Sequence, residues 1–142
     1  MDRLIGIDYG RKRTGLAVSD PLGIFASALD TGHPAKLIEY LKNYALQETI
    51  VRFVVGYPQN LNGEPSEAQK DVDAFLKQLQ KAFPDVPVSL EEERFTSVLA
   101  HRAMIDGGMK YQDRRKKESV DKISAAIILQ SYLDRNQAQA SK

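Results

Sequence analysis

The chain has 142 residues, of which 42% are apolar and 27% are charged, and this balance predicts one globular domain. We assign the domain to residues 1–135 and expect the polar residues 136–142 to fray. Because 20 Lys and Arg residues balance 19 Asp and Glu residues, a uniformly basic coat and an acidic disordered chain are excluded. The absence of Cys excludes disulfides, thiolate zinc sites and cysteine nucleophiles, and it favours the cytoplasm. The longest apolar run, 125–129, is too short to cross a membrane.

Three strands are predicted near the start of the chain. Apolar runs occupy residues 4–7, 14–19 and 24–29. The links between these runs are short, and Pro21 and Gly23 are typical turn residues. We therefore expect the three strands to pair as an antiparallel meander.

Helices and strands alternate in the rest of the chain. Ser66 and Gln69 have the spacing of a capping box, and apolar residues at helical spacing follow them. Strands joined through helices form parallel, right-handed crossovers, which predicts an α/β domain with a mixed sheet and with its two crossover helices on both faces. The expected helices are 34–45, 66–83, 96–105 and 119–133, the expected strands are 50–56 and 86–90, and a charged loop is expected at 111–118.

A carboxylate ends the first predicted strand. Asp8 follows an apolar run and stands two residues before Gly10. Ligands of open α/β sheets gather at the carboxyl ends of strands, and a carboxylate in apolar surroundings needs a hydrogen bond, a counter-charge or a metal ion. The alternative is an Asp that only caps the turn before Gly10.

Three adjacent carboxylates end a later predicted strand. Glu91, Glu92 and Glu93 repel one another, and a bound cation would relieve that repulsion. The alternation of a strand places Glu91 and Glu93 on one side and Glu92 on the other, without indicating which side faces a site. The alternative is a solvated charge cluster.

A third acid, Asp121, lies near the start of the last predicted helix. Taken alone, it is better explained as an Asp that favours the positive end of the helix dipole. Basic residues lie close to two of the acids, at 11–13 and at 114–117. Basic loops beside acids fit a phosphate backbone that passes metal-binding carboxylates, and the alternative is a set of solvated loop charges.

Acids on the first strand, on a later strand and on the last helix resemble the arrangement of the ribonuclease-H-like nuclease superfamily. The finer pattern resembles the YqgF family over nearly the whole chain. Four segments carry the resemblance: 6–20, 54–63, 92–97 and 116–130. The resemblance implies a three-layer domain with a mixed five-stranded sheet, whose first three strands form the antiparallel meander, flanked by helices.

The resemblance also implies the residues of the site. The catalytic and metal-binding acids fall on Asp8, Glu93 and Asp121. Because Glu92 stands where the family has Asp, the choice between Glu92 and Glu93 as the ligand remains open. The residues expected to bind nucleic acid are Arg11, Lys12, Arg13, Arg94, Lys116 and Lys117, and those expected to shape the site are Gly10, Gly15 and Thr96.

The function implied by the resemblance is metal-dependent hydrolysis of phosphodiester bonds, with two Mg²⁺ or Mn²⁺ ions. The expected role is processing of the 5′ end of pre-16S ribosomal RNA, and the alternatives are a Holliday junction resolvase and a non-catalytic nucleic-acid-binding module. The expected partners are structured RNA or branched DNA and pre-ribosomal particles, with no membrane, and the protein is expected to be a monomer or a homodimer. An ATPase of the actin-like class would need two such domains, and this chain holds one.

Overall fold

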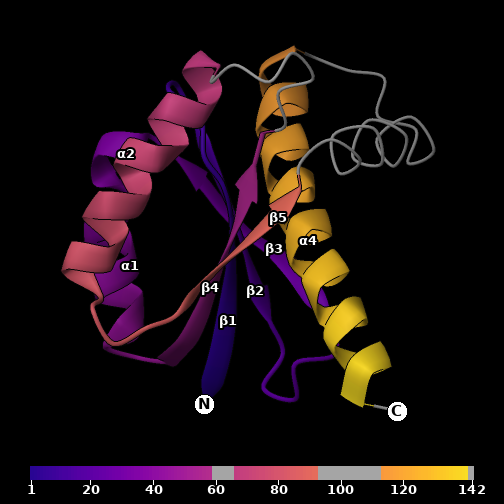
Figure 1. Ribbon diagram of the computed structural model, residues 1–142. Helices are drawn as coiled ribbons and strands as arrows, with labels where there is room; N and C mark the ends of the chain where they lie inside the picture. Colours follow the sequence, from indigo (N-terminus) through magenta and orange to yellow (C-terminus); the bar gives the residue numbers. More distant parts are fainter. Residues whose placement is uncertain (59–65, 93–112, 141–142) are drawn as a thin grey trace.

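The computed structural model describes residues 1–58, 66–92 and 113–140, and in the last of these segments it describes the side chains of 123–136. The described residues form a five-stranded mixed sheet in the order β3-β2-β1-β4-β5 (Figure 1). Strands β1, β2 and β3 pair antiparallel, whereas β4 and β5 continue the sheet parallel to β1. The predicted meander and mixed sheet are therefore confirmed. The strands are β1 (Asp2–Asp8), β2 (Thr14–Ser19), β3 (Ala26–Gly32), β4 (Thr49–Tyr57) and β5 (Val88–Glu92).

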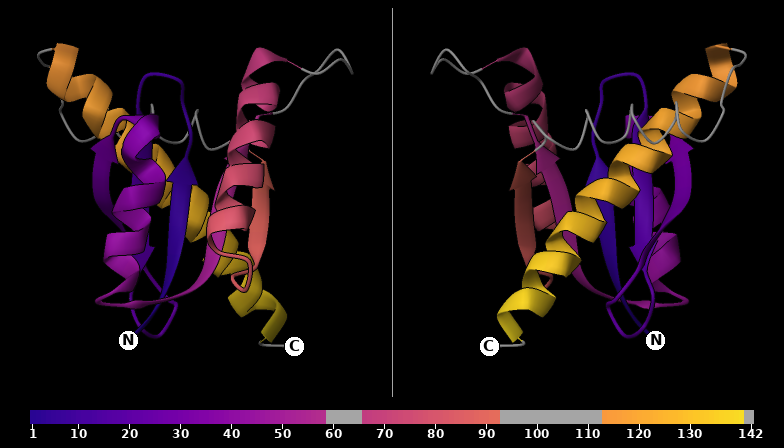
Figure 2. Two further views of the ribbon diagram at one scale, coloured as in Figure 1. Left: turned by 90° about the vertical axis from the view of Figure 1, so that its left-hand side faces the viewer. Right: turned by 90° about the vertical axis from the view of Figure 1, so that its right-hand side faces the viewer.

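Helices cover both faces of the sheet and complete three layers (Figure 2). The 3₁₀ turn η1 (Pro34–Lys36), α1 (Leu37–Ala45) and α2 (Glu67–Ala82) lie on one face, and α4 (Asp113–Ala140) crosses the other. The expectation that the two crossover helices occupy opposite faces is wrong. From β3 to β4 and from β4 to β5 the chain moves in the same direction across the sheet, so right-handed crossovers place both helices on the same face.

Large apolar side chains fill the space between the sheet and helices α1 and α2, which we call the α1/α2 face. Ile5 and Ile7 alternate along β1, and helix α2 presents Val72, Phe75 and Leu79 at helical spacing. The capping box that starts α2 is confirmed, because Gln69 N–H donates to Ser66 Oγ at 3.1 Å and Ser66 N–H donates to Gln69 Oε1 at 3.2 Å.

Small residues line the opposite side of the sheet, which we call the α4 face. A Cβ built on Gly6 would lie 2.7 Å from Leu129 Cβ and 2.8 Å from the carbonyl oxygen of Ala125. Ala17 and Ala125 are also fully buried at this interface. Helix α4 therefore packs directly against the backbone of β1, at a distance that only glycine at position 6 allows.

The start of β3 differs from the sequence-based expectation. Strand β3 begins at Ala26 rather than at residue 24, because the backbone N–H groups of Ile24 and Phe25 donate to Asp20 Oδ1 at 2.7 and 3.1 Å and close the turn. These hydrogen bonds hold the pKa of Asp20 below its ordinary value.

Helix α4 begins at Asp113, so residues 113–118 are helical and the predicted charged loop is wrong there. Their Arg, Lys and Glu residues are good helix formers, and charge alone does not indicate a loop. The polar end of the chain, which the sequence predicts to fray, is helical through Ala140. The predicted helix at 96–105 lies outside the described residues. No helix in the described part of the chain is both long and apolar enough to cross a membrane.

Candidate active site

Asp8 is the last residue of β1, the central strand of the sheet. Successive side chains of a strand alternate between faces: Ile5 and Ile7 belong to the α1/α2 face, and Gly6 lies against α4. Asp8 therefore shares the α4 face with Gly6. Its register partner on β2 is Gly15, a buried residue that has no side chain.

Helix α4 passes the sheet so that its first half lies at the same end as Asp8. The helix runs in the opposite direction to β1, with its first residues at the carboxyl end of that strand (Figure 1). Position 121 lies one helical turn before Ala125, whose carbonyl oxygen meets Gly6. The backbone at position 121 is thus at the carboxyl end of β1; the side chain of Asp121 lies outside the described residues.

The early start of α4 also changes the explanation of Asp121. Position 121 is eight residues beyond Asp113, more than two turns inside the helix. The dipole of a helix stabilises acids only within the first turn. The dipole explanation, which the sequence alone favours for Asp121, is therefore wrong.

Glu91 and Glu92, the two described residues of the glutamate run, lie in different environments. The side chain of Glu91 is 4% exposed and accepts a hydrogen bond from Arg135 of α4 in an ion pair. Glu92 is exposed and pairs in register with Tyr57, which packs against the α1/α2 core. Glu91 therefore lies on the α4 face and Glu92 on the α1/α2 face. For Glu91 the solvated-cluster alternative is wrong. Glu93, Arg94 and Thr96 lie outside the described residues.

The loop between β1 and β2 forms a tight turn beside Asp8. The hydroxyl of Thr14, a residue that is 1% exposed, accepts from Gly10 N–H and donates to the Gly10 carbonyl, each at 3.5 Å. A Cβ at Gly10 would lie 2.5 Å from the carbonyl oxygen of Arg13, so this turn requires glycine. Tyr9 stacks on Phe75 of α2, with ring centroids 4.6 Å apart.

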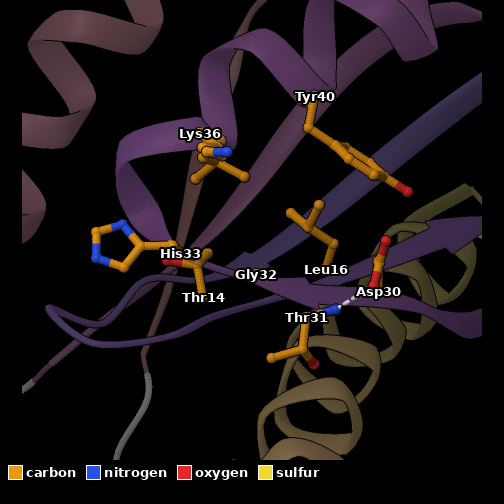
Figure 3. A pocket seen from close by; sticks show the side chains of 9 residues that line it. Thr14, Leu16, Asp30, Thr31, Gly32, His33, Lys36 and Tyr40 are labelled. Carbon is orange, nitrogen blue, oxygen red and sulfur yellow. Dashed lines mark hydrogen bonds between the residues drawn. The ribbon is translucent and has the colours of Figure 1, made fainter.

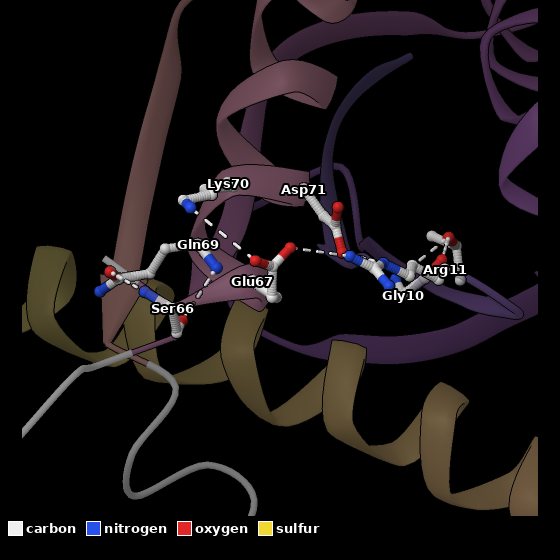
Figure 4. Close-up of polar contacts among 8 residues, drawn as sticks. Gly10, Arg11, Ser66, Glu67, Gln69, Lys70 and Asp71 are labelled. Carbon is white, nitrogen blue, oxygen red and sulfur yellow. Dashed lines mark hydrogen bonds and ion pairs between the residues drawn. The ribbon is translucent and has the colours of Figure 1, made fainter. Parts of the chain in front are cut away.

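Arg11 forms ion pairs with two acidic residues of α2, Glu67 and Asp71. Its Nε donates to Asp71 Oδ2 at 2.6 Å, and a terminal nitrogen donates to Glu67 Oε2 at 3.1 Å (Figure 4). The hydrogen bond to Asp71 raises the pKa of Arg11. The neighbouring Lys12 is exposed. Sequence reasoning missed this contact because periodicity gives no information on which loop lies beside the first turns of α2.

Arg13, another predicted contact with nucleic acid, is half-buried in the loop just before β2, and two more lie on α4. Lys116 and Lys117 are in its first turns, and their side chains are outside the described residues. Among the side chains that the structure describes, no three His, Cys, Asp or Glu residues converge as a metal site. Asp8 supplies a carboxylate oxygen, the donor that Mg²⁺ and Mn²⁺ prefer, at a half-buried strand end. The described part of the predicted site therefore supplies one donor suited to a hard divalent cation.

The fold is the ribonuclease-H-like fold of Holliday junction resolvases. The protein is similar to Thermus thermophilus RuvC in complex with a Holliday junction substrate, with a TM-score of 0.57 and 17% identity over 96% of each chain. It is also similar to the fowlpox virus Holliday junction resolvase, with a TM-score of 0.54 and 14% identity over 94% of this chain and 99% of that one.

The particular family follows from the sequence. The chain belongs to the RuvX (YqgF) family, whose model is described as "Holliday junction resolvase" and matches residues 2–135. A relative from Bacteroides fragilis is 50% identical over 134 residues, which are 94% of this chain and 97% of the relative. One from Parabacteroides distasonis is 48% identical over 139 residues, 98% and 99% of the two chains. Both relatives are named "Putative pre-16S rRNA nuclease".

Proposed function

We propose that this protein is a metal-dependent nuclease that hydrolyses phosphodiester bonds in the processing of the 5′ end of pre-16S ribosomal RNA. One observation carries the proposal: Asp8 and position 121 of α4 lie at the same end and on the same face of the sheet, because Gly6 lets α4 pack against β1. The names of the relatives support ribosomal RNA as the substrate. The proposed setting is a pre-ribosomal particle in the cytoplasm, with the protein acting as a monomer or homodimer.

In this proposal Asp8, Glu93 and Asp121 bind the divalent ions. Two such ions would supply a water nucleophile and neutralise charge on the leaving oxygen. Glu93 is preferred because Glu92 lies on the α1/α2 face, opposite to the face of Asp8. Asp8 ends a central strand: it pairs with Gly15 of β2, and the preceding residue, Ile7, pairs with Val55 of β4.

The basic residues have two different roles in the proposal. Lys12, Arg13, Arg94, Lys116 and Lys117 hold the phosphate backbone, as charged donors do in proteins that bind nucleic acid. Arg11 holds the loop against α2, because its donors are engaged by Asp71 and Glu67. Gly10 allows the turn after Asp8, and Gly15, its register partner on β2, and Thr96 are assigned to the shape of the site.

Two other functions compete with this one. A Holliday junction resolvase is supported by the description of the family model and would cut a branched DNA. A non-catalytic nucleic-acid-binding module would keep the fold without cutting. The three functions differ in whether the protein cuts RNA, cuts branched DNA or binds nucleic acid without cutting it.

The test compares a labelled pre-16S RNA fragment, a four-way DNA junction and single strands, each with Mg²⁺ or Mn²⁺. We expect the wild type to cut the RNA and the D8N variant to lose at least about 100-fold in rate, since an electrostatic contribution to a transition state is of this order. D85N, which changes an exposed Asp in the turn between α2 and β5, is the matched control and should cut normally. Preferred cutting of the junction would favour the resolvase, and rapid cutting by D8N would overturn the assignment of Asp8.

A further inference from the structure

A cavity of about 220 Å³ lies between β3 and the start of α1 (Figure 3). Its apolar lining includes Leu16 of β2 and Leu37 of α1, which are 3% and 4% exposed. The ring of Tyr40 and the carboxylate of Asp30 also line it. Sites for drug-sized ligands begin at roughly 300 Å³, so this cavity suits a single planar ring system.

The cavity lies at the same end of the sheet as Asp8. It reaches Thr14, whose hydroxyl bonds to Gly10 in the turn after Asp8. Strands β1 and β3 are two strand spacings apart, about 10 Å. Thr14 and Leu16 face α1, whereas Asp8 faces α4, so a strand of nucleic acid would reach the cavity around the β3 edge of the sheet.

The polar groups of the cavity match parts of a nucleotide. Asp30 Oδ1 accepts the backbone N–H of Thr31 at 2.7 Å. The pKa of Tyr40 is raised by burial and then by the Asp30 carboxylate, which accepts a hydrogen bond from the Tyr40 hydroxyl. A carboxylate has about four acceptor positions, so Asp30 has capacity for two more donors. Lys36, which is exposed and lines the cavity, supplies a cation for a phosphate.

These features point to one kind of occupant. RNA is recognised by sequence mostly through unpaired bases that stack on aromatic rings and form hydrogen bonds at their Watson–Crick edge. On that edge guanine offers two adjacent N–H donors, which fit a carboxylate, whereas each of the other bases presents only one donor group there. We propose that this cavity binds an unpaired guanine nucleotide of the substrate strand. The proposal rests on the proposed nuclease function and names a determinant of where that nuclease cuts.

The test measures nucleotide binding without metal, so that it is independent of cleavage. GMP, AMP, CMP and UMP are each titrated in EDTA into the ¹⁵N-labelled protein, and the amides of Thr31, Gly32 and Leu37 are followed. We expect saturable shifts with GMP and at least about tenfold weaker binding of the other three. No shift with any nucleotide up to about 10 mM, or equal shifts with all four, would overturn the proposal.

Two variants show whether the binding is in the cavity. Gly32 lines the cavity, and a Cβ added there would meet nothing within 4 Å. G32L therefore adds a bulky side chain at the cavity without a contact at its Cβ and should abolish GMP binding. D30N should remove the preference for GMP over AMP. S27L, at an exposed position of the same strand, is the matched control and should bind GMP as the wild type does. GMP binding that survives in G32L, with a melting temperature close to that of the wild type, would place the nucleotide elsewhere and contradict the proposal.

A cleavage readout separates this proposal from the nuclease function. In D8N, GMP should bind normally although cleavage is lost. In G32L, cutting of RNA should continue with a raised KM, a nearly unchanged kcat and an altered cut position. Normal cut positions in G32L would overturn the role of the cavity and leave the nuclease function intact. If the wild type showed no metal-dependent cutting but still bound GMP in the cavity, only the nuclease function would be overturned.

Discussion

The two faces of the sheet are packed in different ways. On the α1/α2 face, large side chains such as Phe53, Phe75 and Leu79 separate helices from strands. On the α4 face, Gly6 and small side chains let the helix lie directly against the strands. Large side chains can adjust their rotamers when a neighbour changes, whereas a helix packed on bare backbone cannot move closer. We infer that the α1/α2 face mainly provides stability and that the α4 face sets the position of α4 relative to Asp8.

The largest effect on stability is expected on the α1/α2 face. Leu79 is completely buried, and L79A should lower the free energy of unfolding by about 2–5 kcal/mol, because it removes apolar burial and leaves a cavity. Urea unfolding measures this change. Binding of Mn²⁺ by the folded fraction should be unchanged, since this side chain lies away from the α4 face.

The control for L79A is L46A, because Leu46 is 84% exposed and its removal should change stability by less than about 0.5 kcal/mol. A matching loss of metal affinity in L79A would show that the two faces are not separate in function.

A smaller loss of stability, with a loss of activity, is expected from G6A on the α4 face. The added Cβ would meet Leu129 and Ala125 at less than 3 Å, and overpacking of this kind costs about 1–3 kcal/mol. Because α4 must shift to relieve the contact, the rate of cleavage and the affinity for Mn²⁺ should also fall. Converted to free energies, these losses should exceed the loss in the free energy of unfolding. Calorimetry and cleavage assays on the same preparation measure both.

The matched control for G6A is G32A, where an added Cβ has open space. We expect G32A to unfold at the same urea concentration as the wild type or slightly above it. If G6A kept full cleavage activity, the close packing of α4 would not be what positions the site.

The smallest effect is expected from the ion pairs of Arg11, which join the loop after Asp8 to α2. The Arg11 side chain is 63% exposed, and exposed ion pairs contribute little to stability. R11A should therefore leave the melting temperature within a few degrees of the wild type, while it raises KM for nucleic acid because the loop that carries Lys12 is less well held.

The test for this role of Arg11 is a charge exchange. R11D alone should raise KM for nucleic acid. The double variant R11D/D71R should bring KM most of the way back to the wild-type value, since the loop and α2 are again joined by opposite charges. A phosphate contact made by Arg11 itself would show no such recovery.

Much of the fold could be predicted because local patterns reported it directly. The alternating apolar residues of β1, the turn at Pro21 and the capping box at Ser66 each depend on neighbouring residues alone. The start of α4 could not be predicted, because charged residues that form good helices also occur in loops. The placement of α1 and α2 on the same face depends on the order of the strands, which no local pattern contains.

The position of Asp8 was predictable, but the surroundings of the candidate acids were not. Asp8 at a strand end could be identified from its position after an apolar run. Strand alternation predicts that Glu91 and Glu92 lie on opposite sides, but which of them faces α4 follows from an ion pair of Glu91 with Arg135, 44 residues further along the chain, and from the register with β4. The contacts of Arg11 with α2 and the cavity beside Tyr40 likewise join segments far apart in the sequence. Local sequence patterns do not predict such contacts.

The most direct test of the account is the affinity for Mn²⁺, measured by titration calorimetry on the wild type and on D8N, E92Q, E93Q and D121N. The account predicts that D8N, E93Q and D121N each bind Mn²⁺ at least about tenfold more weakly than the wild type, because it assigns these three carboxylates to one metal site. It predicts that E92Q binds as the wild type does. Wild-type affinity in D121N, or a loss confined to E92Q, would contradict the claim that the close packing of α4 on β1 builds the metal site.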